Sequence, residues 1–145
     1  MRTGVLLTPR GGVLARVLPL FRLGLGGRLG PGTQVMSWIG LADYLAAVRF
    51  LLDRADMAGP VNLTTPYPVT NAEFTSAVAA AVHRPALLPV PAPALKLALG
   101  GVTSDLLASA RVLPQRLTAA GYQFQFPHLP SALAAELAGQ PPAAG

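Results

Sequence analysis

Gly24, Gly27 and Gly30 have the Gly-x-x-Gly-x-x-Gly spacing that can hold the pyrophosphate of a dinucleotide. That chemistry needs a strand before the glycines and a helix N-terminus after them, aimed at the phosphates. Here a helical pattern precedes the glycines, and Pro31-Gly32 follows them. We therefore interpret Gly24 to Gly32 as a plain loop.

A tyrosine followed one helical turn later by a lysine can transfer protons, because the ammonium lowers the pKa of the phenol. The three tyrosines are followed at the fourth position by Val48, Asn71 and Phe126, and Lys96 is preceded at the fourth position by Ala92. There is no cysteine, and the two histidines lie far apart. We therefore assign no catalytic, cofactor-binding or metal-ligating residue in this chain.

The composition describes an apolar, weakly charged chain. Of 145 residues 52% are hydrophobic and 12% charged, and the net charge of +5 comes from scattered arginines, so we expect no nucleic-acid binding. The segment Val13 to Leu29 contains arginines and Pro19, so we expect no membrane span. The first residues hold only a short apolar stretch, and we expect a cytoplasmic protein.

Hydrophobic periodicity predicts short buried strands that alternate with helices. Thr70 and Glu73 have the spacing of a capping box, which predicts a helix start. We expect strands at 3–8, 34–39, 61–64 and 87–90, a half-exposed strand at 122–126, and helices at 13–25, 41–54, 70–83, 92–99, 104–113, 114–120 and 131–137. This order predicts an α/β fold with a parallel sheet. Two or three apolar strands do not form a stable sheet alone, so we expect part of a larger domain.

Several segments together resemble a known family. Arg2-Thr3-Gly4-Val5-Leu6-Leu7-Thr8-Pro9 resembles the segment that follows the catalytic helix of epimerase-like extended short-chain dehydrogenases/reductases. Ser37-Trp38-Ile39 leading to Asp43, and Gly59 to Thr64, continue the resemblance. Further matching segments are Pro68 to Phe74, Arg84 to Pro91, Arg111 to Pro114 and Ala120 to Phe124. The branch is the nucleoside-diphosphate-sugar epimerase-like one that carries a small C-terminal domain of unknown function.

The resemblance implies the last strands and helices of a Rossmann-type parallel sheet plus a small, mostly helical C-terminal cap, which together form an incomplete domain. The implied organisation is 1–84 for the end of the NAD(P)-binding epimerase domain, 85–139 for the cap and 140–145 for a disordered tail. NADP or NAD is implied for the complete family protein, and none is expected to be bound by this chain alone. The expected partners are the missing N-terminal half or a second copy, and an unknown small polar substrate.

The resemblance also implies substrate-side residues: Gln34, Ser37 and Trp38, after the glycine loop. An amide can both donate to and accept from a polar ligand, and Trp38 offers a flat face for a ring. The alternative for Trp38 is core packing against the 41–54 helix. The chain departs from the family pattern at Gly40 to Asp43, which keeps one acid where the family has two.

Three functions remain open from the sequence. The first is a piece of an NAD(P)-dependent epimerase-like oxidoreductase that is inactive alone. The second is a non-enzymatic partner protein that pairs through an exposed sheet edge. The third is a small basic protein that binds an anionic ligand.

Overall fold

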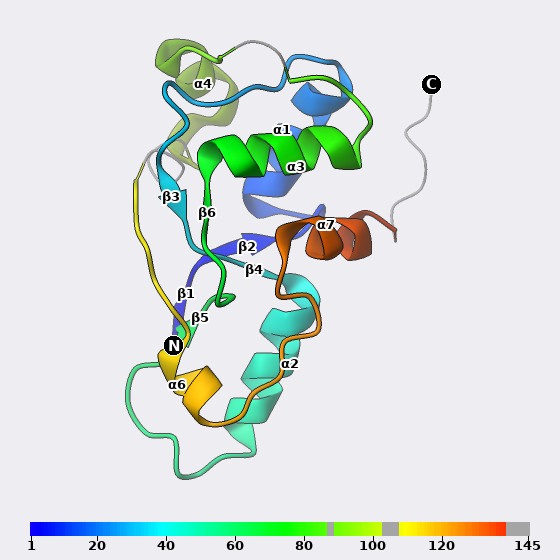
Figure 1. Ribbon diagram of the computed structural model, residues 1–145. Helices are drawn as coiled ribbons and strands as arrows, with labels where there is room; N and C mark the ends of the chain where they lie inside the picture. Colours follow the sequence, from blue (N-terminus) through cyan, green and yellow to red (C-terminus); the bar gives the residue numbers. More distant parts are fainter. Residues whose placement is uncertain (87–88, 103–107, 139–145) are drawn as a thin grey trace.

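The computed structural model describes residues 1–86, 89–102 and 108–138. Short strands lie at the centre, with α1 and α3 on one side of them and α2 on the other (Figure 1). The strands are β1 (Arg2–Thr3), β2 (Val5–Leu7), β3 (Val35–Met36), β4 (Trp38–Gly40), β5 (Asn62–Leu63) and β6 (Val69–Thr70). The helices are α1 (Gly12–Arg22), α2 (Leu41–Leu52), α3 (Asn71–Ala81), α4 (Ala92–Leu99), α6 (Gln115–Ala119), α7 (Leu129–Ala138) and the short 3-10 helix η1 (Gly100–Val102).

The first strand segment, which consists of β1, Gly4 and β2, changes its partner strand at Gly4. β1 pairs with β5 and β2 pairs with β4, both in parallel, whereas β3 and β6 are antiparallel. The N–H of Gly4 donates to Leu63 O at 3.1 Å, and the next N–H, of Val5, donates to Ser37 O at 2.8 Å. The parallel pairs and the helices around them confirm the predicted α/β class.

Two apolar clusters cover the two sides of these strands. The larger cluster packs α1, α3 and α7 against β2 and β4, with Leu7, Leu14, Trp38, Val78 and Leu133 fully buried. In α1 the buried residues Val13, Leu14, Val17, Leu18 and Phe21 recur at helical spacing, as the sequence predicts. The smaller cluster joins α2, β5 and α6 through Ile39, Ala47, Val61, Leu63, Leu117 and Tyr122.

The predicted capping box is confirmed at the start of α3. Thr70 Oγ1 accepts the N–H of Glu73 at 3.2 Å, and Glu73 Oε2 accepts the N–H of Thr70 at 2.6 Å. These two bonds satisfy N–H groups that a helix N-terminus leaves without partners. The predicted loop over 24–32 and the helices at 92–99 and 131–137 are also confirmed.

The predicted strand at 122–126 is wrong. The N–H groups of Gln125 and Phe126 do not join a ladder; each donates to the carboxylate of Asp43 at 2.8 Å. The Tyr122 hydroxyl donates to Asp43 O at 3.0 Å and lies 3.3 Å from Asp43 Oδ1. Asp43 is only 1% exposed, and its carboxylate holds this segment against α2. Burial and the neighbouring charge of Asp43 raise the pKa of Tyr122 well above its ordinary value.

Three other predicted segments fall wholly or partly outside the described residues: 87–90, 104–113 and the tail 140–145. Of the predicted strand at 87–90, Val90 forms a single parallel bridge with Leu29. Residues 108–113 are extended, so the predicted helix at 104–113 is wrong over that part. Within the described ranges no helix is long and apolar enough to cross a membrane.

Candidate functional site

A groove runs between the first strand segment and the extended segment 108–114, which we call the strap. In Figure 1 the strap is the yellow chain that descends past β3 toward α6. The groove has two adjoining pockets of about 420 and 390 Å³. Thr3, Gly4 and Val112 line both of them. The groove therefore lies where the first residues of the chain face the strap, about a hundred positions later.

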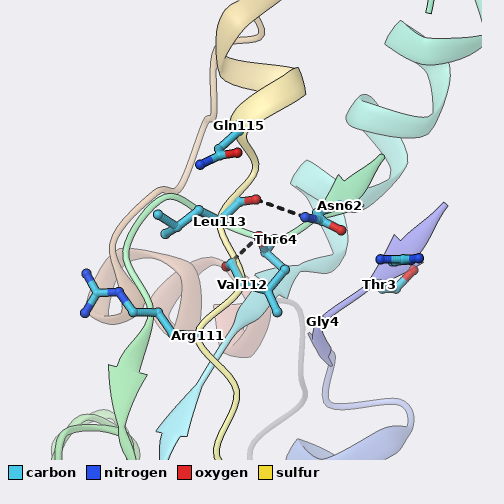
Figure 2. A pocket seen from close by; sticks show the side chains of 9 residues that line it. Thr3, Gly4, Asn62, Thr64, Arg111, Val112, Leu113 and Gln115 are labelled. Carbon is cyan, nitrogen blue, oxygen red and sulfur yellow. Dashed lines mark hydrogen bonds between the residues drawn. The ribbon is translucent and has the colours of Figure 1, made fainter. Parts of the chain in front are cut away.

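Three side chains of the central strands and their flanks fix the strap. Ser37 Oγ donates to Ala110 O at 2.8 Å and accepts the N–H of Val112 at 2.7 Å. Two further bonds, drawn in Figure 2, join Thr64 Oγ1 to Val112 O at 3.2 Å and Asn62 Nδ2 to Leu113 O at 3.2 Å. These contacts satisfy strap backbone groups that a helix would satisfy internally, which is the physical reason for the failed helix prediction.

Gly4 forms the floor of the groove, and the site requires a glycine there. A Cβ on Gly4 would lie 2.6 Å from Ser37 O and 2.8 Å from Thr64 Cγ2. Both distances are far below van der Waals contact, and the nearer atom belongs to the backbone. A side chain at this position would push the strand away from Ser37 and Thr64, two of the residues that hold the strap.

Among the predicted substrate-side residues, only Ser37 lines the groove. Trp38 is fully buried in the larger cluster, and its indole N–H donates to Tyr67 O at 3.1 Å. Gln34 Nε2 donates to Leu29 O at 3.2 Å, and Gln34 Oε1 is buried with no hydrogen-bond partner within the described chain. The structure thus places Ser37 against the strap, whereas Trp38 and Gln34 do not line the two pockets. The substrate-side role of all three residues stays a prediction.

The polar residues of the groove come from three distant segments and no motif marks them. Arg2, Asn62, Arg111 and Gln115 line the larger pocket, and the pocket linings contain no Asp or Glu among the described residues. Figure 2 shows Gln115 above Leu113, and Asn62 beside Leu113 with a bond to its carbonyl. Sequence reasoning missed these residues because the pairing of β1 with β5 brings Arg2 beside Asn62, and the strap, whose path depends on tertiary hydrogen bonds, adds Arg111 and the adjoining Gln115.

Comparison with known proteins identifies related chains. Residues 90–136 match the family model of a domain of unknown function, DUF1731. The chain is 51% identical over 124 residues to the epimerase family protein Mb2239 of Mycobacterium bovis. The aligned region covers 85% of this chain and 41% of that protein. It is 40% identical over 134 residues to the mouse epimerase family protein SDR39U1, and this aligned region covers 92% of this chain and 46% of that protein.

Solved structures give the same result. The crystal structure of human epimerase family protein SDR39U1 (isoform 2) with NADPH matches 96% of this chain and 48% of that chain, with a TM-score of 0.87 and 36% identity. A nucleoside-diphosphate sugar epimerase from Corynebacterium glutamicum matches 94% of this chain and 25% of that chain, with a TM-score of 0.74 and 31% identity.

These matches confirm the predicted resemblance to the C-terminal half of an epimerase-like extended short-chain dehydrogenase/reductase. The homologues are epimerase family proteins, which supports membership of the NAD(P)-dependent epimerase family. The chain spans less than half the length of the curated relatives that it matches. The activity, substrates and partners of a whole relative are therefore proposals for this chain.

Proposed function

We propose that this chain supplies the substrate side of an NAD(P)-dependent epimerase-like oxidoreductase and that it is inactive until a nucleotide-binding half joins it. One observation carries the proposal: a groove closed by the strap lies against a parallel strand in a chain that resembles an NADPH-bound epimerase family protein. The sequence contains no tyrosine-lysine pair one helical turn apart, so the proton-transfer chemistry must come from the other half.

The free edge of the first strand segment supports this arrangement. The N–H groups of Arg2 and Gly4 donate to Val61 O and Leu63 O, and strand geometry directs the N–H of Thr3 to the opposite edge. Among the strands of the described chain β1 pairs with β5 alone, so this second edge of β1 carries no strand there. Parallel strands are stable when both edges are paired, so this edge fits a strand from the nucleotide-binding half.

Co-expression with the first half of the Mycobacterium bovis relative tests the proposal. We expect a one-to-one complex that binds NADPH. Thr3→Pro should weaken the complex because proline has no N–H to offer at the free edge, whereas Thr3→Val keeps that N–H and should assemble normally. Assembly that is equally strong with Thr3→Pro, or no complex with the unaltered chain, would contradict the arrangement.

A second candidate, a non-enzymatic partner protein, uses the same free edge. It differs in its outcome, since it predicts a complex without NADPH turnover or binding.

A further inference from the structure

The two pockets of the groove differ in chemistry. Five polar side chains and the buried Thr64 line the larger pocket: Arg2, Thr3, Asn62, Thr64, Arg111 and Gln115. Apart from the shared residues and Ser37, the described residues that line the smaller pocket are Val5, Val35, Met36, Ala108 and Ala110. Thr3, Gly4 and Val112 connect them, so one ligand can occupy both. We call them the polar lobe and the apolar lobe.

The polar lobe fits an anionic group. Arg2 and Asn62 are register partners on adjacent parallel strands, so their side chains leave the same face side by side. The Asn62 side chain donates through Nδ2 to Leu113 O and forms no other hydrogen bond within the described chain. A guanidinium beside an amide offers several N–H donors to a carboxylate.

No carboxylate of the described protein competes for this position. Four of the five described acids have other contacts: Asp43 holds 122–126, Asp56 pairs with Arg54, Glu73 caps α3 and Glu136 accepts the N–H of Leu41. The fifth, Asp53, lies exposed at the end of α2, outside the groove lining. Neither Arg2 nor Arg111 forms an ion pair within the described residues. Figure 2 shows the Arg111 side chain on the opposite side of the strap from Gly4, so we assign the anionic group to Arg2.

The apolar lobe fits an uncharged, apolar body. Its residues offer methyl, isopropyl and thioether groups, and Met36 is almost fully buried. Of the two hydroxyl residues that line this lobe among the described residues, Ser37 is already engaged as donor and as acceptor by the strap, and Thr3 is shared with the polar lobe. A strongly polar ligand group placed between Met36 and Ala110 would lose its hydration without gaining hydrogen bonds from these two side chains.

We propose that the groove binds a small amphipathic anion, with its carboxylate on Arg2 and Asn62 and its apolar body between Met36 and Ala110. That this ligand is the substrate rests on the proposed function; the binding itself needs only this chain. A nucleoside diphosphate is polar at both ends and suits the apolar lobe poorly. The groove therefore selects for a ligand class that differs from a sugar nucleotide.

Saturation-transfer NMR on the small molecule tests this with the whole chain, and its signal does not depend on whether the chain self-associates. The probe is phenylacetate; acetate has the anionic group alone, benzyl alcohol the apolar body alone, and uridine diphosphate is polar throughout. We expect phenylacetate to bind saturably and the other three to displace it at least roughly tenfold less well, because each loses one of the two lobes.

Two pairs of variants locate the binding. Arg2→Gln should weaken phenylacetate binding roughly tenfold, whereas Arg84→Gln, with the same charge change at an exposed site outside the groove, should not. Ala110→Leu should fill the apolar lobe and block binding, whereas Ala80→Leu on the exposed face of α3 should not. Circular dichroism checks that each variant is folded.

Absence of saturable binding, equal effects of Arg2→Gln and Arg84→Gln, or displacement by uridine diphosphate at a lower concentration than phenylacetate would each overturn the proposal. These outcomes are separate from a failure of the proposed function, because no cofactor, second half or turnover enters the measurement. Loss of assembly with the nucleotide-binding half would leave the amphipathic-anion site intact.

Discussion

Glu136 of α7 caps the N-terminus of α2: its Oε1 accepts the N–H of Leu41 at 2.8 Å. The N-cap residue of α2, Gly40, has no side chain to do this. A Cβ on Gly40 would lie 3.5 Å from the same Oε1 atom, an ordinary van der Waals contact, so the carboxylate lies directly against the start of α2. A residue near the end of the described chain therefore fixes a helix that starts about a hundred residues earlier.

Removal of this cap should destabilise the protein. Glu136→Ala should lower the free energy of unfolding by about 1 kcal/mol, because the Leu41 N–H loses its acceptor. Glu136→Gln keeps an acceptor oxygen and should lose only the charge contribution. Urea denaturation of both variants measures the difference, and equal stability of Glu136→Ala and the unaltered chain would refute the capping role.

Asp43 should matter more, since its carboxylate is buried and accepts two backbone N–H groups. Asp43→Asn replaces one acceptor oxygen by an NH2 group, which cannot accept the backbone N–H that faces it. We expect a loss of about 2 to 3 kcal/mol, the usual cost of leaving buried donors without partners. Asp53→Asn is the control, because Asp53 is exposed at the end of α2. Unfolding of both variants at the same urea concentration would contradict the stabilising role of the Asp43 carboxylate.

The raised pKa of Tyr122 predicts a stability change at alkaline pH. Above the ordinary tyrosine pKa of about 10, the unfolded chain releases the phenol proton while the folded chain keeps it. This contribution is complete below the unfolded pKa and is lost as the pH rises toward the folded value. Tyr122→Phe should be less stable than the unaltered chain near neutral pH, and the difference should shrink as the pH rises above 10.

Thermal unfolding of both proteins across that pH range measures the effect. An ultraviolet titration gives a second readout, in which one tyrosine should resist ionisation until the chain unfolds. A difference between the two proteins that does not vary with pH would show that Tyr122 acts through packing alone.

Ser37 should hold the strap. Ser37→Ala removes one donor to Ala110 O and one acceptor for the Val112 N–H, and we expect a loss of about 1 to 2 kcal/mol. The specific readout is hydrogen exchange, in which the Val112 amide should lose protection more than the amides of α1. Uniform loss of protection would mean a general destabilisation with no special effect on the strap.

Trp38 separates the substrate-side prediction from core packing. Trp38→Phe leaves the Tyr67 carbonyl without its donor and removes volume from a fully buried site, so we expect a loss of about 2 kcal/mol. In the assembled enzyme, unchanged KM and turnover with Trp38→Phe and Gln34→Ala would contradict the substrate-side role of both residues. A raised KM with normal assembly would support it.

The local signals in this sequence predict the elements whose bonds are local. The capping box of Thr70 and Glu73, the periodicity of α1 and the glycine loop all form as expected. The failures lie where a distant side chain takes over backbone bonds. Alternating aromatic residues at 122–126 suggested a strand, but Asp43 binds that backbone.

The groove could not be predicted from the sequence for the same reason. The apolar pattern before Pro114 suggested a helix, but Ser37, Thr64 and Asn62 bind the strap in an extended form. No single-sequence pattern encodes a bond between residues more than forty positions apart. The resemblance supplied the family, whereas the groove and its two lobes required the structure.

Calorimetric titration with NADPH tests the central claim most directly. The account predicts no micromolar binding by this chain alone, because that affinity, about −8 kcal/mol, needs a preformed site for the cofactor. It predicts micromolar binding by the complex with the nucleotide-binding half. Micromolar binding of NADPH by this chain alone would contradict the account, as would a stable complex of both halves that binds none.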